Sequence, residues 1–217
     1  MTLDLSKFYV TNKKPRTMKL GGKTVEDVRY RFCGPICLDG QEFISSSKTG
    51  NSYFCGKHSV VLIPSVGKYV YKFFIFYTKA DKKTIKMLHK IHNILNKHGL
   101  SPKSEEIIVT DIVLDNEILR QKQDNKIEKK LRSRIPEGIG YGLKLRKLQP
   151  IKYRDDKKEA LRQKFLKELK TVCRVRNLKR RNSLDNLLIE SKNLSNLMFC
   201  KDGCYLIDID NRWSIGK

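Results

Sequence analysis

Apolar residues recur at helical spacing in two stretches of the chain. Between Lys79 and His98 they follow one side of a helix, and Gly99 is placed to end it. The same spacing returns from Asp155 to Arg181, where Lys and Arg occupy the opposite side. The pattern therefore predicts two amphipathic helices, the second strongly basic. The apolar positions are Ile85, Leu88, Ile91, His92 and Leu95 in the first, and Ala160, Leu161, Phe165, Leu166, Leu169, Val172 and Cys173 in the second.

Three histidines lie on the first predicted helix or at its end, namely His89, His92 and His98. We interpret them as surface or core-edge residues rather than metal ligands.

Shorter stretches are rich in apolar, β-branched and aromatic residues, several of them alternating, which predicts strands. They are residues 43–46, 60–63, 69–74, 107–109, 112–114 and 140–148. Near the end of the chain, residues 197–199 and 204–207 predict a hairpin around a Lys-Asp-Gly turn. We therefore expect an α+β fold, with an antiparallel sheet before Pro150 and a mainly helical part after it.

The composition adds a strong positive charge to this picture. The 217 residues carry a net charge of +23, with 39% hydrophobic and 32% charged residues. Such a field attracts nucleic acid, an acidic protein partner or anionic lipid. Lys is spread through nearly every segment of the chain. The best local candidates for contacts with a polyanion are Arg174, Arg176, Lys179, Arg180 and Arg181.

We expect a protein without a transmembrane segment in a reducing compartment. No apolar run approaches the ~20 residues that cross a bilayer, and no signal peptide begins the chain. The six Cys do not form a dense disulfide framework, so reduced thiols and a cytoplasmic location are expected.

The predicted hairpin carries a candidate metal site. Asn196 stands just before its first strand, and Asp208 follows its second. Because a tight hairpin brings its two ends together, both side chains can face one cation. Carboxylate and amide oxygens suit Mg²⁺, which fills its coordination shell with water and phosphate oxygens. The alternative is an ordinary surface hairpin with an Asp-rich end.

This pair of residues resembles the metal-binding part of protein-kinase-like proteins. Small-molecule phosphotransferases similar to aminoglycoside kinases often write the second strand as Leu-Ile-Asp-Phe, close to residues 206–209. The resemblance implies a minimal or degenerate protein-kinase-like bilobal fold, similar to truncated effectors and viral kinase-like proteins that act in a host cell. It divides the chain into an N-terminal extension (1–42), an antiparallel N-lobe sheet with one helix (43–150) and a truncated helical C-lobe (151–217).

The same resemblance implies a site for ATP and Mg²⁺. Lys72 matches the strand lysine that reaches the α and β phosphates. Gly50 and Gly56 would belong to a degenerate glycine-rich loop, in which a turn over residues 50–56 covers the phosphates. Ser191 stands where these proteins carry the catalytic Asp, five residues before Asn196.

Three departures from the kinase pattern indicate weak or absent phosphotransfer. The first predicted helix contains no Glu to orient Lys72, Ser191 replaces the catalytic Asp, and only nine residues follow Asp208. We therefore expect a nucleotide-binding pseudokinase, or an enzyme that an acidic protein partner completes.

Residues 33–58 support a second interpretation. Cys33, Cys37, Cys55 and His58 offer four ligands at two knuckle-like sites, compatible with tetrahedral zinc. The protein would then be a basic zinc-knuckle module that binds nucleic acid or serves as a scaffold, without catalytic activity. A third interpretation is a plain hairpin with buried cysteines, which behave as small hydrophobic residues. The three interpretations stay open at this point.

Overall fold

The structure, a computed structural model, describes most of the chain. The described residues are 1–7, 9–12, 16–20, 23–27, 30–45, 50–55, 59–74, 81–113, 138–180, 196–209 and 213–216. Among them strands predominate, with two helices, α1 (Lys82–Asn96) and α4 (Asp155–Val175). Neither of these helices combines the length and the apolar character that a membrane span requires.

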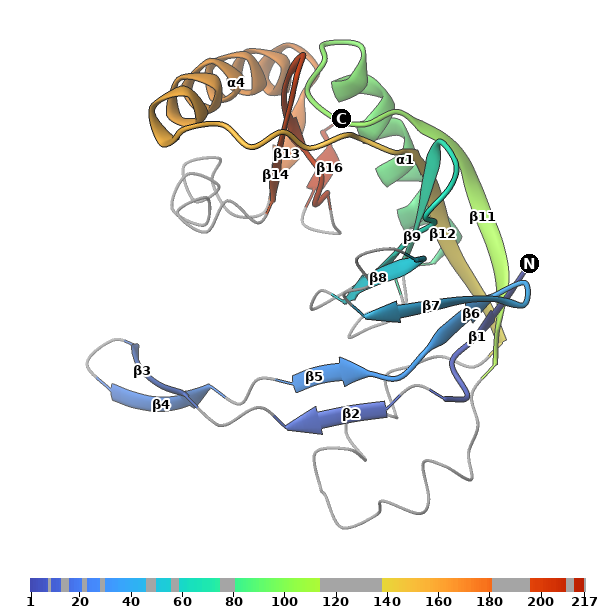
Figure 1. Ribbon diagram of the computed structural model, residues 1–217. Helices are drawn as coiled ribbons and strands as arrows, with labels where there is room; N and C mark the ends of the chain where they lie inside the picture. The colour runs from blue at the N-terminus through green and yellow to red at the C-terminus, as the bar shows by residue number, and fades with distance from the viewer. Residues whose placement is uncertain are drawn as a thin grey trace. The chain divides into compact units, whose positions relative to one another are not determined.

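Eight strands form a closed barrel of parallel and antiparallel pairs (Figure 1). β1 closes the barrel, because it pairs in parallel with β11 and antiparallel with β6. β7 and β8 form a second parallel pair, and β8 and β9 an antiparallel one. In order around the barrel the strands are β1 (Thr2–Asp4), β11 (Ser104–Val113), β12 (Gly138–Arg146), β10 (Tyr69–Phe73), β9 (Val60–Ile63), β8 (Ser52–Cys55), β7 (Gln41–Ser45) and β6 (Ile36–Leu38).

The other described strands form two-stranded sheets. Early in the chain, β2 (Tyr9–Asn12) pairs with β5 (Tyr30–Cys33), and β3 (Arg16–Leu20) pairs with β4 (Lys23–Asp27). After α4, β13 (Leu178–Arg180) pairs with β16 (Trp213–Ile215), and β14 (Leu197–Cys200) pairs with β15 (Gly203–Leu206). The β14–β15 pair confirms the hairpin that the sequence predicted.

The predicted protein-kinase-like bilobal α+β fold is wrong. The sheet is a closed mixed barrel rather than an antiparallel N-lobe sheet, and four strands follow α4 where a helical C-lobe was expected. Residues 1–42 were treated as an extension, yet they supply β1 and β6, which close the barrel. Alternation of apolar and polar residues predicts where a strand lies but does not say which strand it pairs with.

Both helices begin where the sequence places them, within a few residues. The Thr84 N–H donates to Asp81 Oδ1 at 2.7 Å, which caps α1. Hydrogen bonds from the backbone and the side chain of Thr84 lower the pKa of the Asp81 carboxyl group. The buried side of α1 consists of the predicted apolar positions. α4 is shorter than predicted, because Asn177 adopts a left-handed φ of 51° and β13 begins at the next residue.

The chain divides into two compact units. The first comprises Met1–Val66, Phe74–Lys79 and Val109–Gly140, and the second comprises Gly67–Phe73, Ala80–Ile108 and Tyr141–Lys217. Each unit has its own buried apolar side chains. They include Leu3, Ile36, Phe43, Tyr53 and Leu62 in the first unit, and Leu88, Leu143, Leu169, Leu206 and Trp213 in the second.

Gly142 on β12 allows a close approach of β10 that a larger residue would prevent. A Cβ atom there would lie 2.7 Å from the carbonyl oxygen of Lys72 and 2.6 Å from the Phe73 ring. We expect Gly142→Ala to lower the free energy of unfolding by about 1–3 kcal/mol, because a backbone carbonyl cannot rotate away. Urea denaturation measures this loss.

Gly140→Ala is the matched control on the same strand. Its Cβ would lie 2.5 Å from Cδ1 of Ile112, the end of a flexible side chain that can change rotamer. The effect of Gly140→Ala should therefore be smaller. An equal or larger loss for Gly140→Ala would contradict this account of the β10–β12 approach.

Candidate functional site

Lys72 is a buried cation at the end of β10. The strand pairs with β12, with Lys72 opposite Leu143. The Lys72 side chain is only 3% exposed. Burying an ammonium is expensive unless a carboxylate or other acceptors compensate for the lost water. The contacts of Lys72 therefore define the centre of this site.

Asp208 is the carboxylate that meets Lys72. It follows β15 by two residues in the chain, and 136 positions separate it from Lys72. The Lys72 ammonium donates to Asp208 Oδ1 at 2.9 Å and to the Ile209 carbonyl at 3.4 Å. The Asp208 side chain is 40% exposed, so the ion pair joins a buried cation to an anion that also reaches solvent.

Asn196 lies across the hairpin from the residue that precedes Asp208. The hairpin register places it opposite Ile207, whose N–H donates to the Asn196 carbonyl at 3.0 Å. The Asn196 side chain is half-buried. Three residues predicted from the sequence, Lys72, Asn196 and Asp208, thus belong to one region of the second unit.

His92 connects α1 to the strand that precedes Asp208. Its ring is fully buried, and Nδ1 lies 2.7 Å from Ser101 Oγ. Ser101 Oγ also lies 3.2 Å from the carbonyl of Leu206, the last residue of β15. Since a hydroxyl has one proton, Ser101 satisfies both contacts when His92 donates from Nδ1–H and Ser101 donates to Leu206. A further hydrogen bond, from the Leu206 N–H to the Leu100 carbonyl at 2.9 Å, holds the same strand.

The surroundings keep His92 neutral. Burial of the ring is the largest cause and the nearby Lys72 charge the second, and together they lower the pKa of His92 from 6.5 to about 3. With the proton on Nδ1, Nε2 carries a lone pair, and none of the described residues hydrogen-bonds to it. The sequence interpretation as a surface or core-edge histidine missed this role. The signal was present, because His92 falls among the apolar positions of the helix.

The predicted phosphate loop is only partly described. Residues 52–55 form β8 instead of a turn, and the Tyr53 hydroxyl donates to the Gly34 carbonyl at 2.7 Å. The local prediction of a turn is therefore wrong at these positions. Gly50 lies in the bend before β8, whereas Gly56 is outside the described residues. A role of the two glycines in phosphate binding stays a prediction.

The zinc ligands are also incompletely described. Cys37 on β6 and Cys55 at the end of β8 are half-buried cysteines. The side chain of Cys33 and all of His58 lie outside the described part, as does Ser191. Burial, with Asp4 and Glu42 adding to it, raises the pKa of Cys37, which disfavours the thiolate that binds zinc. Across the described side chains there is no cluster of three or more metal-ligating groups, and zinc stays a prediction.

The kinase-like family membership that the motifs implied is wrong, because the fold contradicts it. The barrel is not the fold of that family. Comparisons of the chain with protein-family models, with curated proteins and with solved structures found no match.

Proposed function

We propose that the second unit binds a nucleoside triphosphate with Mg²⁺ at Lys72, Asn196 and Asp208, with little or no phosphotransfer of its own. The proposal rests on the chemistry of these three residues and is independent of the kinase-like fold. ATP is the representative ligand, because a triphosphate offers the charge that Lys72 and a bound Mg²⁺ would share.

The observation that carries the proposal is the 2.9 Å contact between a buried ammonium and a carboxylate that reaches solvent. A buried ion pair is weak evidence for stability, because two well-packed apolar residues often stabilise a fold as well or better. Buried charges with a specific partner are more frequent at functional sites. The exposed side of Asp208 gives a cation in solution access to this pair.

Ligand binding would exchange one set of contacts for another. Mg²⁺ would bind the Asp208 carboxylate and the Asn196 amide oxygen, and water and phosphate oxygens would complete its shell. The Lys72 ammonium would turn from Asp208 to a phosphate oxygen, so that each charge keeps an opposite charge nearby. Because α1 contains no Glu, no carboxylate of that helix holds Lys72 in the exchanged position. The absence of a Glu partner on α1 supports nucleotide binding with weak phosphoryl transfer.

Isothermal titration with ATP and Mg²⁺ tests the proposal. Asp208→Asn should lose at least tenfold in affinity and most of the dependence on Mg²⁺, because one charge-assisted contact contributes about 1.5–3 kcal/mol. Lys72→Met should lose a similar amount, whether or not Mg²⁺ is present. A thermal shift gives a second readout, since a ligand at about 100 times its Kd stabilises by about 2.7 kcal/mol.

Lys144→Met is the matched control. Lys144 also pairs with a carboxylate, Glu106 at 2.7 Å, and it lies on β12 next to β10. The control should bind ATP like the original chain. Unchanged binding by Asp208→Asn, or an equal loss in Lys144→Met, would contradict the proposed site.

A further inference from the structure

The second unit carries an open groove of about 640 Å³ beside the C-terminal half of α4. The groove runs along one side of the helix and reaches His98, just after α1. None of its lining residues belongs to the nucleotide site proposed above. Among them are Lys164, Lys167, Glu168, Val175 and Arg176.

Charge is distributed unevenly along α4. In its N-terminal half, Lys158 pairs with Asp155 at 3.0 Å and Arg162 pairs with Glu159 at 2.7 Å. Between residues 164 and 176 five Lys and Arg side chains accompany a single acid, Glu168. Within the described residues, no ion pair involves the three groove cations Lys164, Lys167 and Arg176. Among the described residues the groove therefore carries an excess of positive charge, with three cations against the single acid Glu168.

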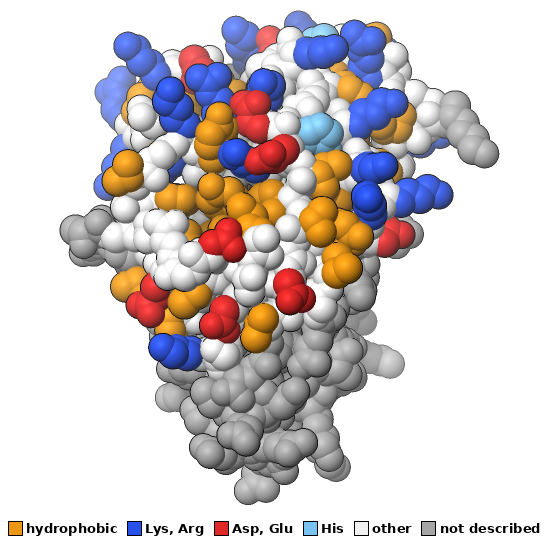
Figure 2. Space-filling view, turned by 90° about the vertical axis from the view of Figure 1, so that its right-hand side faces the viewer, with side chains coloured by type: hydrophobic (Ala, Val, Ile, Leu, Met, Phe, Trp, Pro, Cys, Tyr) orange, Lys and Arg blue, Asp and Glu red, His pale blue; other side chains and the backbone are white. Residues whose placement is uncertain are grey.

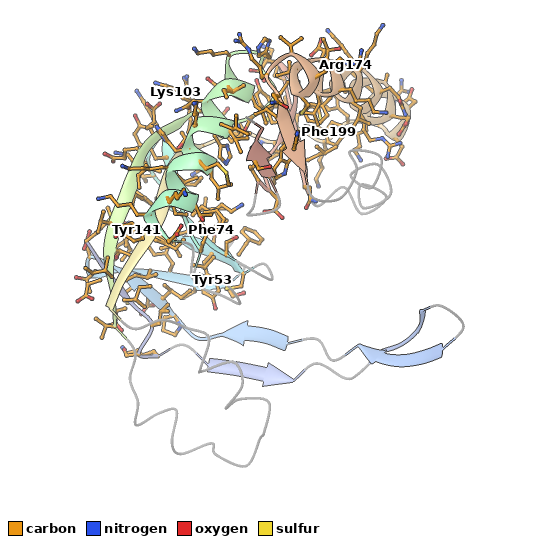
Figure 3. The ribbon with its side chains drawn as sticks, turned by 180° about the vertical axis from the view of Figure 1, so that it is seen from behind. Tyr53, Phe74, Lys103, Tyr141, Arg174 and Phe199 are labelled. Carbon is orange, nitrogen blue, oxygen red and sulfur yellow. The ribbon has the colours of Figure 1, made fainter. Side chains whose placement is uncertain are left out.

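The helix dipole explains only part of this distribution. Cations near a helix C-terminus are stabilised by the last carbonyls, which accounts for Arg174 in the final turn (Figure 3). Lys164 and Lys167 lie two or more turns earlier, where the dipole effect has faded. Their position on the groove side of the helix needs another reason.

We propose that this groove binds the phosphate backbone of nucleic acid without recognising its sequence. Lys164 and Arg176 are separated by about 18 Å at 1.5 Å per residue, which spans about five phosphates of one B-form strand. Lys167 lies between them, and each of the three cations can neutralise one phosphate. The lining residues that the structure describes include no Phe, Tyr or Trp for base stacking and no Asn or Gln for base edges, and His98 at the edge of the groove is their one aromatic ring.

The chemistry of the groove favours nucleic acid over an acidic protein. Lysine is depleted in protein–protein interfaces, which depend on buried aromatic and aliphatic anchors. The groove offers Val172 and Val175 as its apolar residues, beside Lys164 and Lys167. Interfaces with nucleic acid are more polar and much more positively charged.

The test measures binding of a fluorescently labelled duplex of about 20 base pairs by anisotropy, between 50 and 200 mM salt. The groove variant combines Lys164→Gln, Lys167→Gln and Arg176→Gln. Three lost phosphate contacts should lower the log–log salt slope by about 2.7, which corresponds to about 40-fold of salt-dependent affinity over this range. Glu168→Gln should tighten binding, because it removes the one acid of the groove.

The control variant removes the same formal charge from exposed lysines of the same unit outside the groove, with Lys152→Gln, Lys157→Gln and Lys201→Gln. This control is needed because Lys and Arg side chains also crowd the upper part of the face drawn in Figure 2. It should keep the original slope, and circular dichroism establishes that each variant is folded.

Three outcomes would overturn the proposal: equal losses in the groove and control variants, no gain from Glu168→Gln, or equally effective competition by polyglutamate at matched charge. The last outcome would assign the groove to an acidic protein. The site is separate from the nucleotide proposal, because Asp208→Asn should bind the duplex like the original chain whether or not that chain binds ATP.

Discussion

Asp208→Asn should destabilise the protein more than Lys72→Met does. The Asp208 variant leaves a buried ammonium, 3% exposed, beside a neutral amide in place of the carboxylate at 2.9 Å. The Lys72 variant leaves a carboxylate that is 40% exposed and can be hydrated. Breaking a fully buried pair costs about 3–5 kcal/mol, and the exposure of Asp208 reduces this to about 2 kcal/mol.

Urea denaturation at pH 7 measures both variants. The surface pair of Lys144 and Glu106 serves as the control, because its partners are 26% and 56% exposed. Glu106→Gln should change the free energy of unfolding by no more than about 1 kcal/mol. Adding Lys72→Met to Asp208→Asn should recover part of the loss, since the buried charge disappears. The explanation fails if Lys72→Met is the more damaging single variant.

Stability should fall as the pH drops below 6.5, because His92 is buried in its neutral form. The pKa of His92 is about 3 in the folded protein against an ordinary value of 6.5. Between these values the unfolded chain binds a proton that the folded protein does not, so the free energy of unfolding rises with pH across this window. Each pH unit contributes up to about 1.4 kcal/mol, or about 2 kcal/mol between pH 6.5 and pH 5.

Urea denaturation at a series of pH values, compared between variants, isolates this contribution. His92→Asn removes the titrating ring and keeps a side-chain donor for Ser101. It should flatten the dependence between pH 6.5 and pH 5, even though the variant is less stable at pH 7. His98→Asn, at an exposed position after α1, should keep the original slope. Parallel curves for His92→Asn and the original chain would show that other groups cause the dependence.

Several elements of secondary structure follow from local spacing along the chain. α1, α4, β9, β10 and the β14–β15 hairpin all appear close to their predicted positions. Each depends on interactions between residues a few positions apart, such as the cap at Asp81 and the apolar side of α1. Such patterns can be recognised in a single sequence.

The candidate site was predictable only in part. The sequence singled out Lys72, Asn196 and Asp208, and the structure brings Lys72 and Asp208 into direct contact. The sequence did not indicate that Lys72 is buried or that Asp208 neutralises the charge of Lys72. His92 and Ser101 were missed as partners, although only nine positions separate them, and the contact of Ser101 with Leu206 joins residues 105 positions apart.

The sequence by itself determined the two amphipathic helices, the terminal hairpin and the excess of positive charge, since periodicity, turn residues and composition are properties of short segments or of simple sums. Only the tertiary structure decided that β1 lies between β6 and β11 and closes a barrel. The pairing of strands depends on which distant surfaces fit together, and a period of two residues is the same for every possible partner. For the same reason, only the folded chain shows the ion pair of Lys72 with Asp208, the neutral His92 and the groove beside α4.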